Sequence, residues 1–371
     1  MNIFNKESIE KFGEKLIKSI NPLEQELIDK YIIPRGGIHS ENTLEYAMIK
    51  TLIPSLMIGY ENIPRVRPLP KVNFEVVKNA NLNAIAIKTE KENDYLVLVN
   101  SGLIKEIISF IEFFINSDHN LYKKEYETNK NWFRSLFYQV IIEHEFSHIF
   151  NGHLGLIQEV WQNQTIEEQR DESKKQEYKF LLQTLEMDAD CTGLSRLYGW
   201  LINHAKIENH PMVTDFARNP IQSFSDLIMS FYVINKFYYD LTSLSKDIGQ
   251  STHLTPRERI MGSFGNVLLA IKTYRFDINP KDLMDETIKK INWVENIFLE
   301  EYGIPYNQEF WENEEYLHHT EVTLKVLHNW TNIQPGLLKH NYIPIVGVER
   351  DLKINDWYSS YEKSEQNENE T

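Results

Sequence analysis

The chain has 371 residues, of which 42% are hydrophobic and 12% aromatic, and its formal net charge is −15. This composition excludes a disordered chain and is sufficient for one large or two modest domains. The negative charge argues against nucleic-acid binding and against docking on anionic lipid, because both need a basic surface. Cys191 is the only cysteine, which excludes a disulfide framework and a cysteine-type zinc site.

The apolar stretches of the chain do not predict a membrane protein. The N-terminus lacks the uninterrupted apolar segment of a secretory signal. The two most apolar stretches, 102–116 and 227–239, are interrupted by charged residues and fall short of a membrane span. We therefore expect a cytoplasmic protein without membrane insertion, while its oligomeric state stays open.

The first hundred residues predict helices followed by strands. Residues 1–65 are expected to form a helical N-terminal extension, which ends in a proline-rich linker. Three β-like runs follow at Val72–Val77, Asn83–Thr89 and Tyr95–Asn100, and the segments between them have the composition of hairpin loops. These runs predict a small, mainly antiparallel sheet.

The rest of the chain is predicted to be mostly helical, which makes the expected fold class α+β and predominantly helical. Helical patterns cover 102–116, 133–150, 178–198, 221–246, a segment from 279 onward, and 307–331. Thr255 and Glu258 have the spacing of a capping box, with Pro256 at the first helical position, and this places His253 just ahead of a helix. Residues 271–362 form a helical C-terminal region, and 363–371 a disordered tail.

The motif that carries chemistry is His144-Glu145-Phe146-Ser147-His148. On a helix, the two imidazoles lie on one face one turn apart, which suits a single metal ion. Glu145 lies beside the first imidazole, where it can reach a water on that metal. Apolar residues spaced three and four apart support the helix, and Asn151-Gly152 is a plausible stop.

A catalytic zinc site needs a third protein ligand and an open position. Glu186 and Asp190 are four residues apart in an apolar helical pattern, where unpaired carboxylates are costly. One carboxylate can bind zinc, and the other can accept a hydrogen bond from a ligand histidine. His153 has the wrong spacing for the metzincin pattern and reads as a helix-end residue, whereas Asp188 is expected at the surface.

This combination, HExxH followed by Glu186-Met187-Asp188-Ala189-Asp190, resembles the gluzincin metallopeptidases. Within them it is most similar to the clan of the membrane protease HtpX and the CAAX-prenyl protease. Three further segments match that clan in the same order along the chain. Asn83-Ala84-Ile85-Ala86 resembles the edge strand of the clan, and Val99–Ile104 resembles its strand-into-helix segment. Ser251-Thr252-His253 with Arg259 resembles its Ser-x-His-Pro-x-x-x-x-Arg segment. Leu254 replaces the proline of the last segment. Residues 144–153 also resemble the phage-exclusion peptidases of the Lit type.

The resemblance implies a zinc metallopeptidase domain at 66–270 that binds one Zn²⁺ per chain. It implies that His144, His148 and Glu186 bind zinc and that Glu145 is the general base. Asp190 would orient a ligand histidine, and His253 with Arg259 would stabilise the oxyanion. The substrate would bind at Asn83, Ala84, Ile85 and Ala86.

The implied function is a metalloendopeptidase that hydrolyses internal peptide bonds of a protein substrate bound as an extended strand. A latent or phage-defence protease is one form of this function. The alternative is a non-catalytic, zinc-containing module that binds peptides or regulates a partner.

Overall fold

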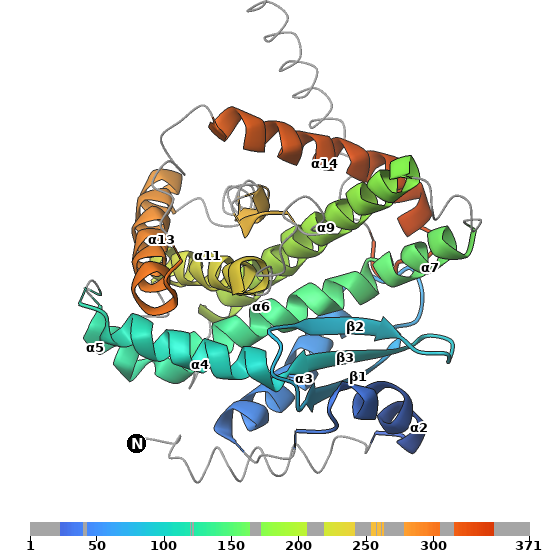
Figure 1. Cartoon of the computed structure of the whole chain (residues 1–371), viewed down its shortest axis with the longest axis horizontal. Helices are drawn as coiled ribbons and strands as arrows, with labels where there is room; N and C mark the ends of the chain where they lie inside the picture. Colours follow the sequence, from blue (N-terminus) through green and yellow to red (C-terminus); the bar gives the residue numbers. More distant parts are fainter. Residues whose placement is uncertain are drawn as a thin grey trace, which may run out of the picture.

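The computed structural model describes residues 23–39, 43–118, 120, 122–163, 172–205, 219–241, 254–256, 258–260, 262, 278–304 and 315–344. This part of the chain is mostly helical and carries one small sheet, which confirms the α+β, predominantly helical class (Figure 1). The calls on the tail at 363–371 and on His253 lie outside the described residues.

The helices are α2 (Gln25–Leu27), η1 (Ile28–Ile32), η2 (Ile33–Arg35), α3 (Leu44–Glu61), α4 (Ser101–Asn116), α5 (Lys123–Thr128), α6 (Lys130–Phe150), α7 (His153–Asn163), α9 (Glu172–Ala205), α11 (Pro220–Lys236), η3 (Phe237–Leu241), α13 (Pro280–Tyr302) and α14 (Glu315–Leu337). The strands are β1 (Lys71–Val77), β2 (Ala84–Lys88) and β3 (Asp94–Asn100).

The strands lie where the sequence predicts them, but their order differs from a meander. The sheet has the order β1-β3-β2, with β1 parallel and β2 antiparallel to β3. The prediction of a mainly antiparallel sheet is therefore wrong: the sheet is mixed, and only the second loop closes a hairpin. The reason is the burial of β3, whose apolar residues are covered on both sides, so that it takes the central place.

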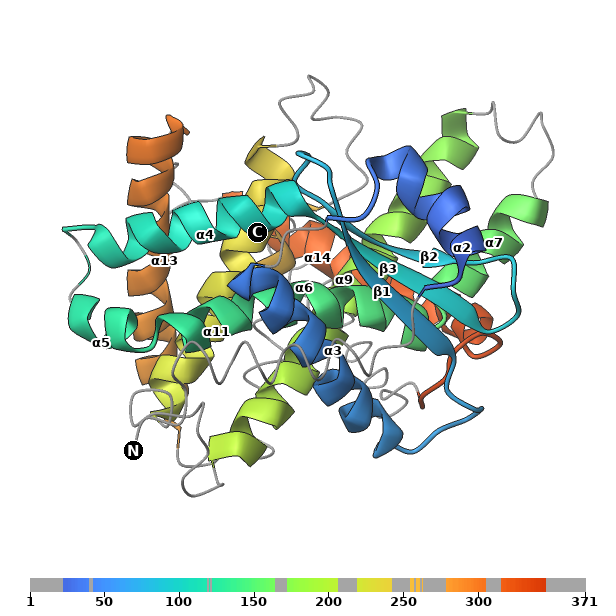
Figure 2. The same ribbon diagram turned by 90° about the horizontal axis from the view of Figure 1, so that it is seen from below.

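Different helices cover the two faces of the sheet (Figure 2). Val97 and Val99 of β3 belong to the main hydrophobic core with α4 and α6. Leu96 and Leu98 point the other way and pack against Ile32 of the N-terminal segment. Successive side chains of a strand point to opposite faces, so β3 packs on the main core with one face and on the N-terminal segment with the other.

The helix α6 lies between the sheet and the helices α9 and α11, and most of its residues are buried. It ends where the sequence predicts. Asn151 is the C-cap, and Gly152 follows with a φ of +84°, which favours glycine. A Cβ on Gly152 would also lie 2.6 Å from the main chain of Asn341, so the turn needs glycine for space as well.

One hydrophobic core joins the three predicted regions. It contains Ile49 of α3, Phe146 of α6, Phe298 of α13 and Tyr342 after α14. The described parts of 1–65 and 271–362 therefore pack with the central region, and the domain boundaries themselves stay a prediction. None of the described helices is both long and apolar enough to cross a membrane.

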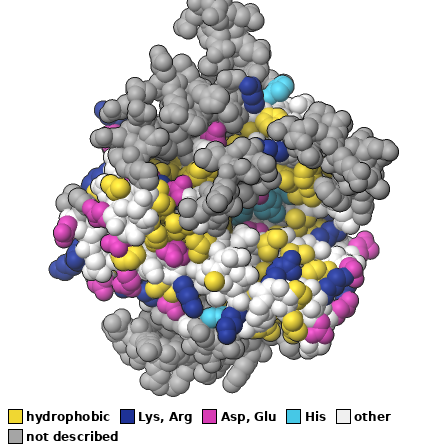
Figure 3. Space-filling model, viewed as in Figure 1, with side chains coloured by type: hydrophobic (Ala, Val, Ile, Leu, Met, Phe, Trp, Pro, Cys, Tyr) yellow, Lys and Arg dark blue, Asp and Glu magenta, His cyan; other side chains and the backbone are white. Residues whose placement is uncertain are grey.

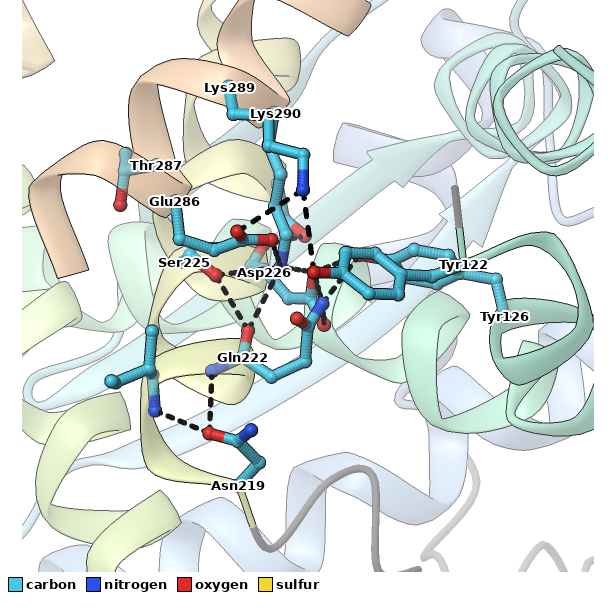
Figure 4. Close-up of polar contacts among 12 residues, drawn as sticks. Tyr122, Tyr126, Asn219, Gln222, Ser225, Asp226, Glu286, Thr287, Lys289 and Lys290 are labelled. Atoms are coloured by element: carbon cyan, nitrogen blue, oxygen red, sulfur yellow. Dashed lines mark hydrogen bonds and ion pairs between the residues drawn. The ribbon is translucent and has the colours of Figure 1, made fainter. Parts of the chain in front are cut away.

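A buried polar cluster ties α11 to α13 and α5 (Figure 4). Lys290 Nζ of α13 lies 2.5 Å from Asp226 Oδ1 of α11, and both side chains are fully buried. Tyr126 of α5 donates to the same Asp226 oxygen at 2.5 Å, and Lys290 also donates to Ser225 at 2.7 Å. Burial lowers the pKa of Lys290, and the charge of Asp226 opposes that shift.

Candidate metal centre

Three metal-binding side chains converge between α6 and α9. His144 and His148 lie one turn apart on α6, and their Nε2 atoms are 3.1 Å apart. Glu186 of α9 faces them, with Oε2 3.4 Å from His144 Nε2 and Oε1 3.4 Å from His148 Nε2. The helices approach closely at Gly193 of α9, where a Cβ would lie 3.3 Å from the main chain of Glu143.

Side chains grouped in this way could hold one metal ion. In a tetrahedral site with bonds of about 2.0–2.1 Å, two ligand atoms lie about 3.3 Å apart. The two Nε2 atoms are 3.1 Å apart, and each lies 3.4 Å from a different carboxylate oxygen of Glu186. One ligand atom from each of the three side chains lies within 4.8 Å of the other two. Two imidazoles and one carboxylate are also a usual donor set for catalytic zinc. The side chains that the sequence predicts as ligands therefore form a suitable cage.

The outer nitrogen of His144 is held by a buried ion pair. Asp190 Oδ1 lies 2.9 Å from His144 Nδ1. Arg259 holds both oxygens of Asp190, with Nε and Nη2 each donating at 2.6 Å. Because Asp190 accepts from Nδ1, Nε2 of His144 is left to face the other ligands. The predicted contact of Asp190 with a ligand histidine is therefore present.

Arg259 is buried, and its guanidinium lies on Asp190 and 3.5 Å from Glu186 Oε2. The predicted capping box places it there: Glu258 N donates to Thr255 Oγ1 at 3.2 Å, and Thr255 N donates to Glu258 Oε2 at 2.7 Å. The role of Arg259 toward an oxyanion stays a prediction.

The charges around His144 determine its protonation. Burial lowers the pKa of His144, but the hydrogen bonds and charges of Asp190 and Glu186 outweigh burial and raise that pKa to about 10. Burial also raises the pKa of Asp190, yet Arg259 and His144 bring it below its usual value. Asp190 is therefore a carboxylate, and a metal ion at His144 would compete with a proton for its ring nitrogen.

The outer nitrogen of His148 is held by residues that the sequence analysis missed. His153 Nδ1 lies 3.0 Å from His148 Nδ1, and His153 Nε2 lies 2.8 Å from Asp188 Oδ2. Asp188 also accepts from Asn151 at 2.7 Å and from Trp330 of α14 at 2.8 Å.

The prediction that Asp188 lies at the surface is wrong, because its side chain is only 13% exposed and faces His153. His153 is not the helix-end residue that the sequence predicts: it begins α7 and is fully buried against His148. The signal was the break at Asn151-Gly152, which separates α6 from α7 and places His153 next to His148.

Glu145 extends from α6 toward the strand β2. It is buried, and burial raises the pKa of its carboxyl group, while His144 and His148 oppose the shift. The main-chain amide of Ala86 in β2 also hydrogen-bonds this carboxyl group and lowers its pKa.

The strand β2 forms an edge of the sheet within the described part of the chain. Asn100 N donates to Asn83 O at 3.0 Å and Thr89 N to Asp94 O at 2.9 Å, so odd-numbered residues bond to β3. The main-chain groups of Ala84 and Ala86 therefore point away from β3. Of the four predicted substrate-binding residues, Asn83 and Ile85 direct their main-chain groups to β3 instead.

Tyr238 of η3 is a second residue that the sequence analysis missed. A small cavity beside the centre is lined by His144, Asp190, Arg259 and Tyr238, with apolar side chains of α6 and α11. Burial and the charge of Glu145 raise the pKa of Tyr238, and its hydroxyl is hydrogen-bonded by the main chain of Ala84.

The centre lies in a recess. The side chains of His144 and His148 are 13% and 11% exposed. Figure 3 shows histidine side chains in a hollow near the middle of one face.

Comparisons of the chain with protein families, with curated proteins and with solved structures found no match.

Proposed function

We propose that this chain is a zinc-dependent metalloendopeptidase of the gluzincin type, which hydrolyses internal peptide bonds of a protein substrate. The observation that carries the proposal is the convergence of His144, His148 and Glu186 at zinc-ligand distances, with Glu145 beside them. A structural zinc site has no use for an acid at the position of Glu145, whereas hydrolysis needs a base there.

Zinc, when bound, supplies a Lewis acid that polarises the substrate carbonyl and acidifies a water molecule. Glu145 takes the proton of the attacking water as the oxygen forms its bond to the carbonyl carbon. It then delivers this proton to the amine nitrogen as the C–N bond breaks. Asp190 and Arg259 hold His144 in its ligand orientation throughout.

The substrate would bind along β2. The main-chain groups of Ala84 and Ala86 point away from β3, and their amides hydrogen-bond Tyr238 and Glu145, contacts that an incoming peptide would replace. An extended peptide adds to such an edge by main-chain hydrogen bonds, which tolerate many sequences. The scissile bond would then lie between the edge strand and the metal centre.

The test is the replacement of Glu145 by Gln in the full chain. Fluorescently labelled, unfolded casein serves as the probe, and bound zinc is measured by elemental analysis. We expect one zinc per chain in both proteins, with cleavage by Glu145→Gln lower by about 100-fold or more. Glu127→Gln, at an exposed position of α5, is the matched control and should cleave like the wild type.

Retained cleavage in Glu145→Gln would remove the mechanism. Casein binding without cleavage by the zinc-loaded wild type would favour the non-catalytic peptide-binding module instead.

A further inference from the structure

The two histidine ligands are supported in different ways. His144 is held by Asp190 and Arg259, as described above. The support of His148 begins at His153 Nδ1, 3.0 Å from His148 Nδ1, and continues to Asp188 and the indole of Trp330. Trp330 lies on α14, far along the chain from the HExxH helix.

The choice of metal-binding nitrogen on His148 determines which atom donates in the hydrogen bonds from His148 to His153 and from His153 to Asp188. If His148 uses Nε2 as the ligand atom, its Nδ1 carries a proton and donates it to His153 Nδ1. His153 Nδ1 must then be an acceptor, so the proton of His153 is on Nε2 and is donated to Asp188 Oδ2. Asp188 is the terminal acceptor, and its position determines those of both imidazoles.

Asp188 is held from two elements. Asn151 Nδ2 donates to Oδ2 at 2.7 Å from the end of α6, and Trp330 Nε1 donates to Oδ1 at 2.8 Å from α14. The contact between Trp330 and Asp188 is supported by the neighbouring Asn329, whose Nδ2 on α14 donates to Thr184 Oγ1 of α9 at 2.8 Å. Val326 of α14 packs beside Met187 and Cys191 of α9, which lie on either side of Asp188 in the sequence.

We propose that Trp330 is a positioning residue for His148, acting through Asp188 and His153, so that α14 belongs to the support of the metal centre. The inference rests on the zinc site of the proposed function and adds the C-terminal helix to it. Without the indole N–H, Asp188 loses a donor to Oδ1 and the orientation of His153 loosens. Zinc affinity then falls, because outer contacts of this kind fix the direction of the ligand atom.

The test measures the zinc dissociation constant of the full chain by competition with a chromogenic chelator. We expect an increase of about 3- to 10-fold for Trp330→Phe and about 10- to 100-fold for Asp188→Asn. Trp132→Phe is the matched control, because the indole nitrogen of this buried tryptophan has no hydrogen-bond partner among the described residues. Its zinc affinity should equal that of the wild type.

A second readout separates positioning from stability. The visible absorption of the cobalt(II)-loaded protein reports the ligand geometry, and it should change in Trp330→Phe but not in Trp132→Phe. Should Trp330→Phe fail to fold, as judged by circular dichroism, Asp188→Asn carries the test, since it keeps the shape of the side chain.

Unchanged zinc affinity and an unchanged cobalt spectrum in folded Trp330→Phe, or in Asp188→Asn, would overturn the inference and leave the zinc site standing. A lower thermal stability with wild-type zinc affinity would overturn it as well, because the contact would then be structural only. A wild type that binds no zinc would overturn both the inference and the proposed function.

Discussion

The side chain of Arg259 is fully engaged with an acid that has no exposure to solvent. Asp190 is buried with its charge neutralised by Arg259 and His144. Removing Arg259 leaves the buried Asp190 with His144 as its remaining partner, and breaking a buried ion pair costs up to about 3–5 kcal/mol. We therefore expect Arg259→Met to lower the free energy of unfolding of the metal-free protein by about that amount in denaturant titration.

The control for Arg259→Met is Arg65→Met, at an exposed loop position, which should leave the free energy of unfolding unchanged. A role of Arg259 confined to the oxyanion predicts the opposite result. Arg259→Met would then be as stable as the wild type and would lose only the rate of cleavage.

The grouping of His144, His148 and Glu186 was predictable from sequence because HExxH and Glu186 with Asp190 lie on two regular helices, where a spacing of four residues fixes a common face. His153 and Asp188 were not predictable in this way. Their contact depends on the break between α6 and α7 at Gly152, whose φ is +84°, and on the packing of α7 against α9. Spacing rules apply within one helix and do not extend across such a turn.

At the scale of elements, β2 offers a test of substrate binding. Ala84 is the first residue of the strand, and its N–H points away from β3, so proline there removes an edge donor and keeps the ladder. The loss of one hydrogen bond, about 0.5–1.5 kcal/mol, should raise KM for a peptide substrate about 3- to 10-fold. The melting temperature should fall, but by less than in a variant that breaks the ladder, because the Ala84 N–H also contacts the buried Tyr238 hydroxyl.

Ile85→Pro is the matched variant for the edge-strand test. Its N–H bonds to β3, so proline removes a ladder hydrogen bond and should lower the melting temperature. Equal KM values for Ala84→Pro and the wild type would show that peptides do not bind along this edge.

The extents of the strands were predictable from sequence, whereas their order was not. The hairpin of β2 and β3 follows from a short polar loop, but nothing in the segment between β1 and β2 excludes a second hairpin. The parallel pairing of β1 with β3 depends on Leu96 and Leu98 finding cover from Ile32 of the N-terminal segment. That contact joins residues remote in sequence, which local patterns do not encode.

At the scale of the molecule, the N-terminal and C-terminal regions, to which the sequence analysis assigned no function, contact the helix α6 that carries the HExxH motif. Tyr342, after α14, donates its N–H to Phe150 O at the end of the HExxH helix at 2.8 Å. Tyr60 of α3 donates to Glu143 Oε2 at 2.8 Å, one residue before the first ligand. Both contacts fix α6 from outside the region that resembles the peptidases, so the candidate metal centre depends on contacts from all three regions.

The buried pair of Lys290 and Asp226 provides the last prediction, on how α13 is joined to the rest. Both side chains are fully buried, so neither charge has water as an alternative partner. Lys290→Met leaves the carboxylate of Asp226 without its cation and should lower the free energy of unfolding by about 3–5 kcal/mol. Lys281→Met, at an exposed position of the same helix, is the control and should have little effect.

The double variant Lys290→Met with Asp226→Leu distinguishes pairing from packing. Exchanging a buried ion pair for apolar side chains of similar volume is often neutral or stabilising, so the double variant should recover most of the lost stability. The measurement is denaturant unfolding of the single and double variants, completed with Asp226→Leu as a double-mutant cycle. A double variant as unstable as the sum of the singles would mean that the lysine stabilises the fold by filling space, not by its charge.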